Sequence, residues 1–581
     1  TTTTSPDGRV TTEFKDSDGT IFLQKIGTGN SIQETYYAYD SRRRLRWVLQ
    51  PEATARIKAL AASSSSANPS MFSQSDSTAQ KFCFIYNYNG KSQMTEKRIP
   101  GKGFEYMVYD PAGRLVATQD SVLRAQNRWI LTRYDSLSMV AETCLFCDTS
   151  ITTREQLQAQ FNQNPHPASI YSASGNILLT CSRYGTSPPS SLNFANVTGV
   201  VTTHDCDSRT MGLLTYDKTL DLSSLSLPEA QRRYRERAYY YDHKARVIQT
   251  VEVMPEGEVT RNSTKYDFTG NPLAVAYTVS SGSNASLQTG TQTLWQTFTY
   301  DHRGRRLSST SALNDTGYTF SAVNYGYDAL GRLSESQRGK TSSKGSTILS
   351  PSTATPVLKD SLSYNIQGWM TSQTDKVLTG SSNQPYGLYS QSLGYHNPQK
   401  ANTTPSFDGL ITEWETIQGS DGADMTKPGS TQTASTYAFA YDSFGRLMES
   451  ARYAGSNVTA TNTYTERGLA FDSNGNILSL TRYGVSAANS QDSLLYSYSG
   501  NRIRTLAGKH NSKDISHQAE GDTNAGTEDY RYDGNGNMTY DALRHIAMTY
   551  DINNLVSTVS RNDTILAIYT YLADGTKYKV M

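Results

Sequence analysis

A short motif, Tyr-Asp-x-x-Gly-Arg, recurs along nearly the whole chain and limits its fold more than any other feature. In the copy YDALGRL at residues 327–333, Tyr325 and Tyr327 alternate with small or polar residues, as in a strand that buries one face. Asp328 begins a turn because its carboxylate can accept the backbone N–H two residues later, and Gly331 supplies the positive φ that closes a short hairpin. Each copy therefore predicts a strand, a tight turn and a return strand.

The copies follow one another at intervals of tens of residues, which is the signature of a repeat array. The clear copies place their aromatic residue, aspartate and glycine at Tyr109, Asp110 and Gly113; Tyr266, Asp267 and Gly270; Tyr300, Asp301 and Gly304; Tyr327, Asp328 and Gly331; Tyr441, Asp442 and Gly445; Phe471, Asp472 and Gly475; and Tyr532, Asp533 and Gly536. Divergent copies begin at Tyr39, Tyr134, Tyr241, Tyr364 and Tyr550, with Arg43, Ser138, Ala245, Gly368 and Asn554 at the glycine position. About a dozen copies that agree predict one elongated or wrapped assembly.

On these motifs the chain resembles YD-repeat, or RHS-repeat, proteins over roughly its whole length. The resemblance implies an all-β fold, a spiral of antiparallel β-hairpins wound into a hollow shell or barrel, as in the C components of insecticidal toxin complexes, bacterial RHS effectors and the teneurin barrel. Segments 12–16, 82–86, 96–101 and 128–135 are similar to the region that precedes the repeats in RHS proteins of Bacteroidetes. A β-propeller is the alternative fold, although unequal intervals fit equal blades poorly.

The density of the motif divides the chain into three parts. Residues 1–140 are expected to begin the shell, residues 141–237 form a decorated insertion with few repeats, and residues 238–581 form the repeat shell itself. The last hairpin motif runs to the end of the sequence, so we expect the repeat region to be truncated before the RHS core.

Several segments interrupt the strand pattern. Residues 55–62 and 154–160 have helical character, and residues 227–237, which contain Pro228, are predicted to form a further helix that starts at the proline. Polar stretches are predicted to be loops at residues 63–77 and 514–527. Residues 339–355 and 381–436, rich in Ser, Thr, Gly and Gln, are predicted to be surface loops, with a binding or plug segment as the alternative.

Composition excludes some classes of partner. The 39 tyrosines and only 36% hydrophobic residues suit sheets with one wet face and one aromatic face better than a thick aliphatic core. A net charge of +1 gives no basic excess to bind nucleic acid. No run of about 18 apolar residues and no basic, hydrophobic leader is present, so neither a membrane span nor a signal peptide is predicted.

The five cysteines gather partly in the insertion. Cys144 and Cys147 form a C-x-x-C, followed by Cys181 and then by His204 and Cys206. This group could be a zinc or redox site, or its cysteines could form one or two disulfides that pin the insertion. Because the spacing lacks the second close Cys/His pair of usual zinc sites, we favour disulfides and predict no metal and no cofactor.

The repeated aspartates could suggest acid–base catalysis. Each one has a local role in its turn, and the same role at every copy explains the spacing, so no catalytic residue is predicted. The arginine after the glycine is explained by cross-strand pairing and stacking on tyrosine. In related RHS proteins a self-cleaving aspartyl site follows the last repeats and precedes a variable toxin; this sequence ends before such a motif, so neither activity is assigned to it.

These observations lead to a functional hypothesis. The resemblance implies a non-enzymatic β-shell segment of a polymorphic toxin, secreted or on the bacterial cell surface, which encapsulates and shields its own C-terminal toxin domain. We expect a lumen lined with polar and aromatic side chains. Secretion-system or cell-surface components are further candidate partners.

Two alternatives remain open. The first is a surface adhesion or glycan-binding protein, with Trp295, Trp369 or Trp414 in shallow grooves. The second is an enzyme such as a polysaccharide lyase, which would need a cleft of convergent carboxylates, arginine and tyrosine. Asp-Ser/Thr-aliphatic tripeptides, which resemble O-glycosylation sites of exported Bacteroidetes proteins, begin at Asp120, Asp135, Asp360, Asp492 and Asp563.

Overall fold

The protein is a long ribbon of antiparallel hairpins. The computed structural model describes residues 1–29, 31–63, 73–171, 173, 175–280, 291–313, 318–340, 355–377, 386–400, 403–419, 432–454, 460–485, 490–510 and 530–581. In these residues 31 strands form one sheet and six form a second, and each strand pairs with its neighbours in the sequence within its sheet. The all-β prediction is confirmed. Because pairing runs unbroken from β1 to β31, these residues do not form separate propeller blades, and that alternative is wrong.

The main sheet extends from β1 to β31, and the second sheet follows it in the sequence. The first part of the main sheet comprises β1 (Thr2–Thr4), β2 (Val10–Lys15), β3 (Ile21–Thr28), β4 (Ser31–Tyr39), β5 (Leu45–Leu49), β6 (Cys83–Tyr88), β7 (Met94–Arg98), β8 (Glu105–Tyr109), β9 (Leu115–Gln119), β10 (Arg128–Tyr134), β11 (Val140–Cys147), β12 (Ile177–Tyr184), β13 (Leu214–Leu220), β14 (Tyr234–Tyr241), β15 (Val247–Val253) and β16 (Val259–Tyr266). The second part comprises β17 (Pro272–Ser280), β18 (Thr291–Tyr300), β19 (Arg306–Leu313), β20 (Tyr318–Tyr327), β21 (Leu333–Lys340), β22 (Thr355–Tyr364), β23 (Met370–Val377), β24 (Tyr386–Gly394), β25 (Glu413–Gly419), β26 (Gln432–Tyr441), β27 (Leu447–Ala454), β28 (Thr461–Phe471), β29 (Ile477–Arg482), β30 (Asp492–Ser499) and β31 (Arg502–His510). The second sheet comprises β32 (Arg531–Tyr532), β33 (Met538–Asp541), β34 (Ile546–Tyr550), β35 (Val556–Arg561), β36 (Thr564–Tyr571) and β37 (Lys577–Val580).

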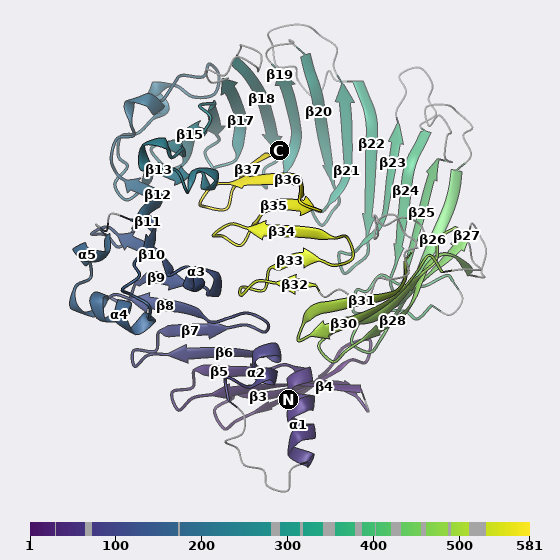
Figure 1. Ribbon diagram of the computed structural model, residues 1–581. Coiled ribbons are helices and arrows are strands. Elements are labelled where there is room, and N and C mark those ends of the chain that lie inside the picture. The colour runs from purple at the N-terminus through teal and green to yellow at the C-terminus, as the bar shows by residue number, and fades with distance from the viewer. Residues whose placement is uncertain are drawn as a thin grey trace.

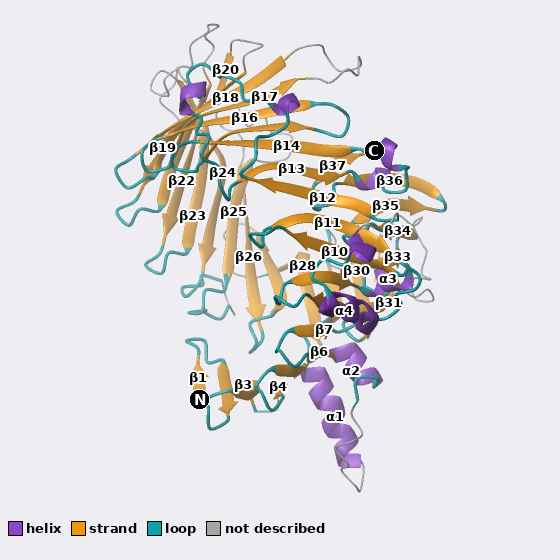
Figure 2. Ribbon diagram, turned by 90° about the vertical axis from the view of Figure 1, so that its left-hand side faces the viewer, coloured by secondary structure: helices purple, strands orange, loops and turns teal. Residues whose placement is uncertain are grey.

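The ribbon curves into a ring and overlaps itself. Figure 1 shows the strands of the main sheet following one another around the ring, with β28–β31 coming back beside the N-terminal strands. The strands β32–β37 lie within the outline of that ring, and Figure 2, seen from the side, places them along one flank of the molecule. The chain is therefore a spiral whose later hairpins run along its earlier ones.

Much of the sheet is a single layer. A sheet packed on one face alternates between buried and exposed residues. In β5 and in β35 every residue is instead half-buried, so the two faces of these strands are about equally accessible.

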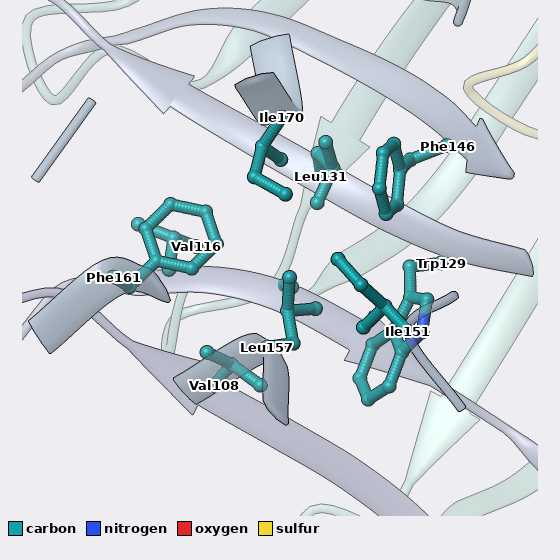
Figure 3. Packing of buried hydrophobic residues seen from close by; sticks show 10 residues of the cluster. Val108, Val116, Trp129, Leu131, Phe146, Ile151, Leu157, Phe161 and Ile170 are labelled. Carbon is teal, nitrogen blue, oxygen red and sulfur yellow. The ribbon is translucent and has the colours of Figure 1, made fainter. Parts of the chain in front are cut away.

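Buried apolar clusters lie where something covers the sheet. The largest forms beneath α4 (Arg154–Gln163) and α5 (Ala168–Tyr171), where Leu157, Phe161 and Ile170 pack on Trp129 and Phe146 of the main sheet (Figure 3). A second cluster lies at α1 (Pro51–Ser63) and α2 (Ser77–Phe82). Further clusters lie beside the short helix α3 (Ser121–Ala125) and the 3-10 turns η2 (Ser190–Leu192) and η4 (Leu222–Ser224).

Two of the predicted helices form and one does not. The segment 55–62 lies inside α1, and α4 begins at Arg154 with Thr153 as its N-cap. The helix predicted at 227–237 is wrong: only the 3-10 turn η5 (Glu229–Gln231) forms, and Tyr234 already begins β14. Pairing with β13 on one side and β15 on the other overrides the local helical preference.

The predicted loop at 381–436 is also partly wrong, because it contains β24 and β25. Their Ser, Thr, Gln and Glu residues lack the apolar alternation on which the prediction relied. In a single-layer sheet, a strand needs only a paired strand on each side, and both strands have these partners. Residues 64–72, 341–354 and 514–527, also predicted to be loops, lie outside the described part of the chain.

Candidate functional site

The repeat turns are built alike around their aspartate. Asp328 accepts backbone N–H groups from Leu330 (3.0 Å) and Arg332 (2.8 Å) on one carboxylate oxygen, and Gly331 has φ +87°. The other oxygen accepts Nε–H of Arg332 at 2.6 Å. These backbone and side-chain hydrogen bonds from Arg332 lower the pKa of Asp328. The turn therefore satisfies its own carboxylate completely.

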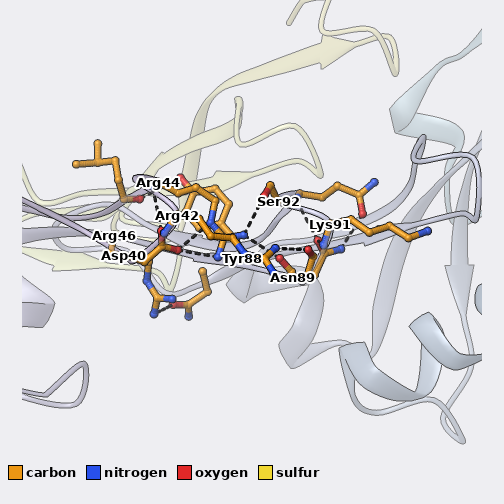
Figure 4. Close-up of polar contacts among 12 residues, drawn as sticks. Asp40, Arg42, Arg44, Arg46, Tyr88, Asn89, Lys91 and Ser92 are labelled. Atoms are coloured by element: carbon orange, nitrogen blue, oxygen red, sulfur yellow. Dashed lines mark hydrogen bonds and ion pairs between the residues drawn. The ribbon is translucent and has the colours of Figure 1, made fainter. Parts of the chain in front are cut away.

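The same arginine joins each hairpin to the next. Arg332 donates Nη1–H to the carbonyl of Asn365 (2.9 Å), and its guanidinium lies 4.8 Å from the ring centre of Tyr364. Figure 4 shows this arrangement at an earlier turn, where Arg44 bonds Asp40 and reaches the Asn89 carbonyl at 2.8 Å. Further arginine–aromatic pairs are Arg44 with Tyr88, Arg114 with Tyr134, Arg246 with Tyr266, Arg305 with Tyr327 and Arg446 with Phe471.

The repeat tyrosines also bond backward along the ribbon, a role that the sequence pattern did not reveal. The hydroxyl of Tyr364 donates to the carbonyl of Leu333 at 2.9 Å, in the preceding hairpin. Equivalent bonds run from Tyr39 to Ile21, Tyr88 to Leu45, Tyr134 to Leu115, Tyr266 to Val247, Tyr327 to Arg306, Tyr441 to Ile411, Tyr498 to Ile477 and Tyr532 to Ile503. We call the sheet joined in this way, β1–β31, the wall.

Asparagine replaces the arginine after the glycine in three turns: Asn271 within the wall, and Asn476 and Asn537 in two turns that reach the overlap. Asn476 and Asn537 still donate to the aspartates Asp472 and Asp533, at 2.7 and 2.9 Å. Asparagine is too short to stack on the next tyrosine as arginine does. These turns keep their own geometry but lack the arginine link along the ribbon.

The same two turns carry a second asparagine that reaches across the overlap. Asn474 accepts the backbone N–H of Glu52, in the first turn of α1, 422 residues away (3.0 Å). Asn535 accepts the N–H groups of Ser121 and Val122, at the start of α3, at 3.0 and 3.2 Å. Each asparagine thus supplies an acceptor to free donors at a helix N-terminus.

Other contacts continue the overlap at both ends. Asp7 accepts hydrogen bonds from the Ser406 hydroxyl and the Phe407 N–H, both at 2.5 Å. Although burial raises the pKa of Asp7, these bonds lower it overall. We call the contacts between residues 7–256 and residues 406–579 the seam.

The far end of the seam is ionic. Arg235, 4% exposed, contacts Asp574 at 2.8 Å and Asp217 at 3.4 Å. Burial raises the pKa of Asp574, but the Thr576 N–H and the Arg235 charge lower it overall. The N–H of Ala573 donates to the Leu220 carbonyl at 2.8 Å. The last hairpin is thus attached to β13 and β14.

The predicted cysteine group is spread over several elements. Cys144 and Cys147 lie on β11 and Cys181 on β12, while Cys206 follows the 3-10 turn η3 (Thr203–Asp205), which contains His204. All five cysteines of the chain are free, so the predicted disulfides do not form. Burial raises the pKa of Cys144 to about 11. Among the described residues no three His, Cys, Asp or Glu side chains are placed to hold a metal ion.

The tryptophans of the adhesion or glycan-binding alternative lie partly inside the protein. Trp295, Trp369 and Trp414 are all half-buried; Trp369 packs on Tyr395 at 5.0 Å, and Trp414 donates its Nε1–H to Gln391 at 3.0 Å.

Carboxylates, arginines and a tyrosine do converge at Asp217. Arg237 (3.0 Å) and Tyr239 (2.6 Å) both bond its carboxylate, so these groups satisfy one another.

Of the helices that the structure describes, none has the length and apolar character needed to cross a membrane.

Comparisons with known proteins find structural matches alone. No protein-family model matches the chain, and no curated protein sequence matches it. A TcdB2–TccC3–TEV crystal structure is 12% identical, with a TM-score of 0.48 over 98% of this chain and 23% of that one. The Photorhabdus luminescens Tc holotoxin pore is 11% identical, with a TM-score of 0.42 over 98% and 25%. The chain therefore spans about a quarter of the length of the solved chains that it matches.

At these scores the assignment of the fold rests on the chain's own geometry. Hairpins pair in sequence order, an aspartate accepts the turn N–H groups, and tyrosine and arginine join each hairpin to its neighbours. The repeat fold that the YD-repeat resemblance predicted is thereby confirmed.

Proposed function

We propose that this chain is a non-enzymatic segment of a β-shell that encloses a polypeptide guest. The observation that carries the proposal is the seam, where hairpin turns are joined by specific hydrogen bonds to helices more than 400 residues away in the sequence. A free edge of a β-ribbon exposes unpaired groups, and a spiral that overlaps itself covers them. An overlapping wall of this kind is suited to separating an interior from solvent.

The nature of the guest is a further part of the proposal. A toxic domain that follows the shell in the same polypeptide would be retained by the wall without any covalent bond. The single-layer sheet supports a container role, because it leaves both faces of strands such as β5 and β35 accessible. A secreted or cell-surface location, and partners from a secretion system, belong to the same proposal.

Protection of a guest is the test. Intact mass and terminal sequencing of the native protein determine whether polypeptide continues past Met581 and stays associated with the wall. We expect that polypeptide to resist protease in the native protein and to become sensitive when Asn474 and Asn535 are both changed to alanine. A protein with no retained polypeptide, or with one that is cleaved equally in both forms, would contradict the container role.

A further inference from the structure

One repeat turn leaves a carboxylate oxygen unpaired. Between β34 and β35, Asp551 accepts the N–H groups of Asn553 (2.9 Å) and Leu555 (3.0 Å), as in the other turns. Residue 555 is leucine where most of the repeat turns have arginine or asparagine, so its side chain cannot bond the second oxygen. That oxygen is buried and has no hydrogen-bond partner. A buried unpaired polar atom of this kind requires an explanation.

This turn lies in the seam. Asp551 lines a cavity of about 310 Å³ together with Leu123 of α3 and Leu222 of η4. The next residue, Ile552, packs on the buried cluster that contains Leu123 and Leu220. The unpaired oxygen therefore belongs to a turn whose docking holds the second sheet to the wall.

The charged and titratable groups around it do not neutralise it. From α3, the N-cap Asp120 accepts the Asn554 side chain at 3.3 Å. Arg128 of β10 and Tyr550 line the same cavity, and Tyr571 is close enough for its pKa to be raised in part by Asp551. The lining residues from η4 and the segment after it, Leu222 and Leu225, are apolar.

We propose that Asp551 makes the seam sensitive to acid: the turn at residues 551–555 docks firmly on α3 and η4 when this carboxyl carries a proton, and docks weakly when it is ionised. The protonated group removes the buried charge and supplies an O–H donor inside the cavity. The proposal concerns the wall itself and holds whether or not a guest is enclosed.

The direction of the effect follows from linkage. Burial raises the pKa of Asp551, so the docked state binds the proton more tightly than the undocked state. The contribution of protonated Asp551 to the stability of the docked state is complete below the ordinary carboxyl pKa of about 3.9. It is lost as the pH rises through the raised pKa of the docked state. Asp7 and Asp574 have lowered pKa values and lose their contributions only in stronger acid. Mild acid therefore strengthens this contact while the ends of the seam stay ionised.

Hydrogen exchange of the whole chain, corrected for the intrinsic pH dependence of exchange, tests the proposal. We expect protection of α3 and of the 551–555 turn to fall several-fold as the pH rises from about 4, near the ordinary carboxyl pKa, to about 8. Asp551→Asn should keep protection high across this range, and Leu555→Arg, which restores the partner found in other turns, should flatten the profile.

Asp533→Asn is the matched control, because the carboxylate of Asp533 is already bonded by Asn537 at 2.9 Å. This variant should keep the pH dependence of the native protein. A flat profile in the native protein would overturn the proposal, and so would an Asp551→Asn variant that retains the native pH dependence.

Discussion

The turns of the wall and the turns of the seam use one backbone geometry for two purposes. In most turns, arginine follows the glycine and stacks on the next aromatic ring, so the turn strengthens the ribbon along its length. In the two seam turns at Asp472 and Asp533, asparagine takes that position and a second asparagine reaches a helix N-terminus in a distant part of the chain. Two side chains thus decide whether a hairpin binds its neighbour or closes the spiral.

The residues at the tips of the wall turns and the seam turns also differ in how far they are buried. The wall turns leave apolar tips in solvent: Phe268 is 86% exposed and Ile366 90%. At the seam, the equivalent residues Ile552 and Ala573 pack on a buried cluster. The apolar tip contributes to stability only where another part of the ribbon covers it.

The ionic end of the seam should give the largest effect. Arg235→Met removes a buried cation and leaves Asp217 and Asp574 without their shared partner. We expect the opening free energy of β36 and β37, measured by hydrogen exchange, to fall by about 3 kcal/mol. Lys579→Ala, which removes the exposed pair with Glu256, should cost about 0.5 kcal/mol. Equal losses in the two variants would show that Arg235 is not the anchor.

Loss of a seam asparagine should rank next. Asn535→Ala removes the acceptor for two N–H groups of α3 and should reduce protection of α3 by about 1 kcal/mol. Arg303 occupies the same turn position in the wall and is exposed, so Arg303→Ala should change stability by less than about 0.5 kcal/mol. Unchanged protection of α3 in the Asn535→Ala variant would show that the Asn535 turn does not stabilise this helix.

A wall tyrosine should have a similar or slightly smaller effect. Tyr327→Phe deletes the 2.7 Å bond to the Arg306 carbonyl and should cost about 1 kcal/mol of local stability. Tyr300 is the matched control because its buried hydroxyl has no partner, so Tyr300→Phe should be neutral or slightly stabilising. If both variants lose the same stability, the hydroxyl bond is not what joins the hairpins.

Effects no larger than these concern the glycine position. Ala245 has φ +59° in a turn where most copies have glycine, so Ala245→Gly should stabilise that turn by about 1 kcal/mol. Gly475→Ala should destabilise its turn by a similar amount, since φ is +88° and no atom lies within 4 Å of an added Cβ. Thermal unfolding of both variants measures the difference, and a destabilising Ala245→Gly would contradict the strain argument.

The sequence predicts the hairpins well because their chemistry is local. Asp328 and Gly331 determine their turn within four residues, and the same signal recurs at each copy. It predicts β24 and β25 poorly because polar strands in a single layer lack apolar alternation.

The sequence pattern does not predict the seam, and the reason is different. The seam partners are separated by up to 451 residues, and no local pattern pairs Asn474 with α1. A signal was nevertheless present, since only the turns at Asp472 and Asp533 combine asparagine two residues after the aspartate with asparagine after the glycine. The pairing of Arg235 with Asp574 had no such signal.

A disulfide across the seam tests the central claim most directly. A Cβ added at Gly534 would lie 3.2 Å from the Cβ of Ser121, close to the separation in a disulfide. We predict that Ser121→Cys with Gly534→Cys forms an intramolecular disulfide on mild oxidation, identified by peptide mass spectrometry. The control pair Ser121→Cys with Gly475→Cys should not link. Absence of the link in the first pair, or equal linking in both, would contradict a spiral that closes on itself at this position.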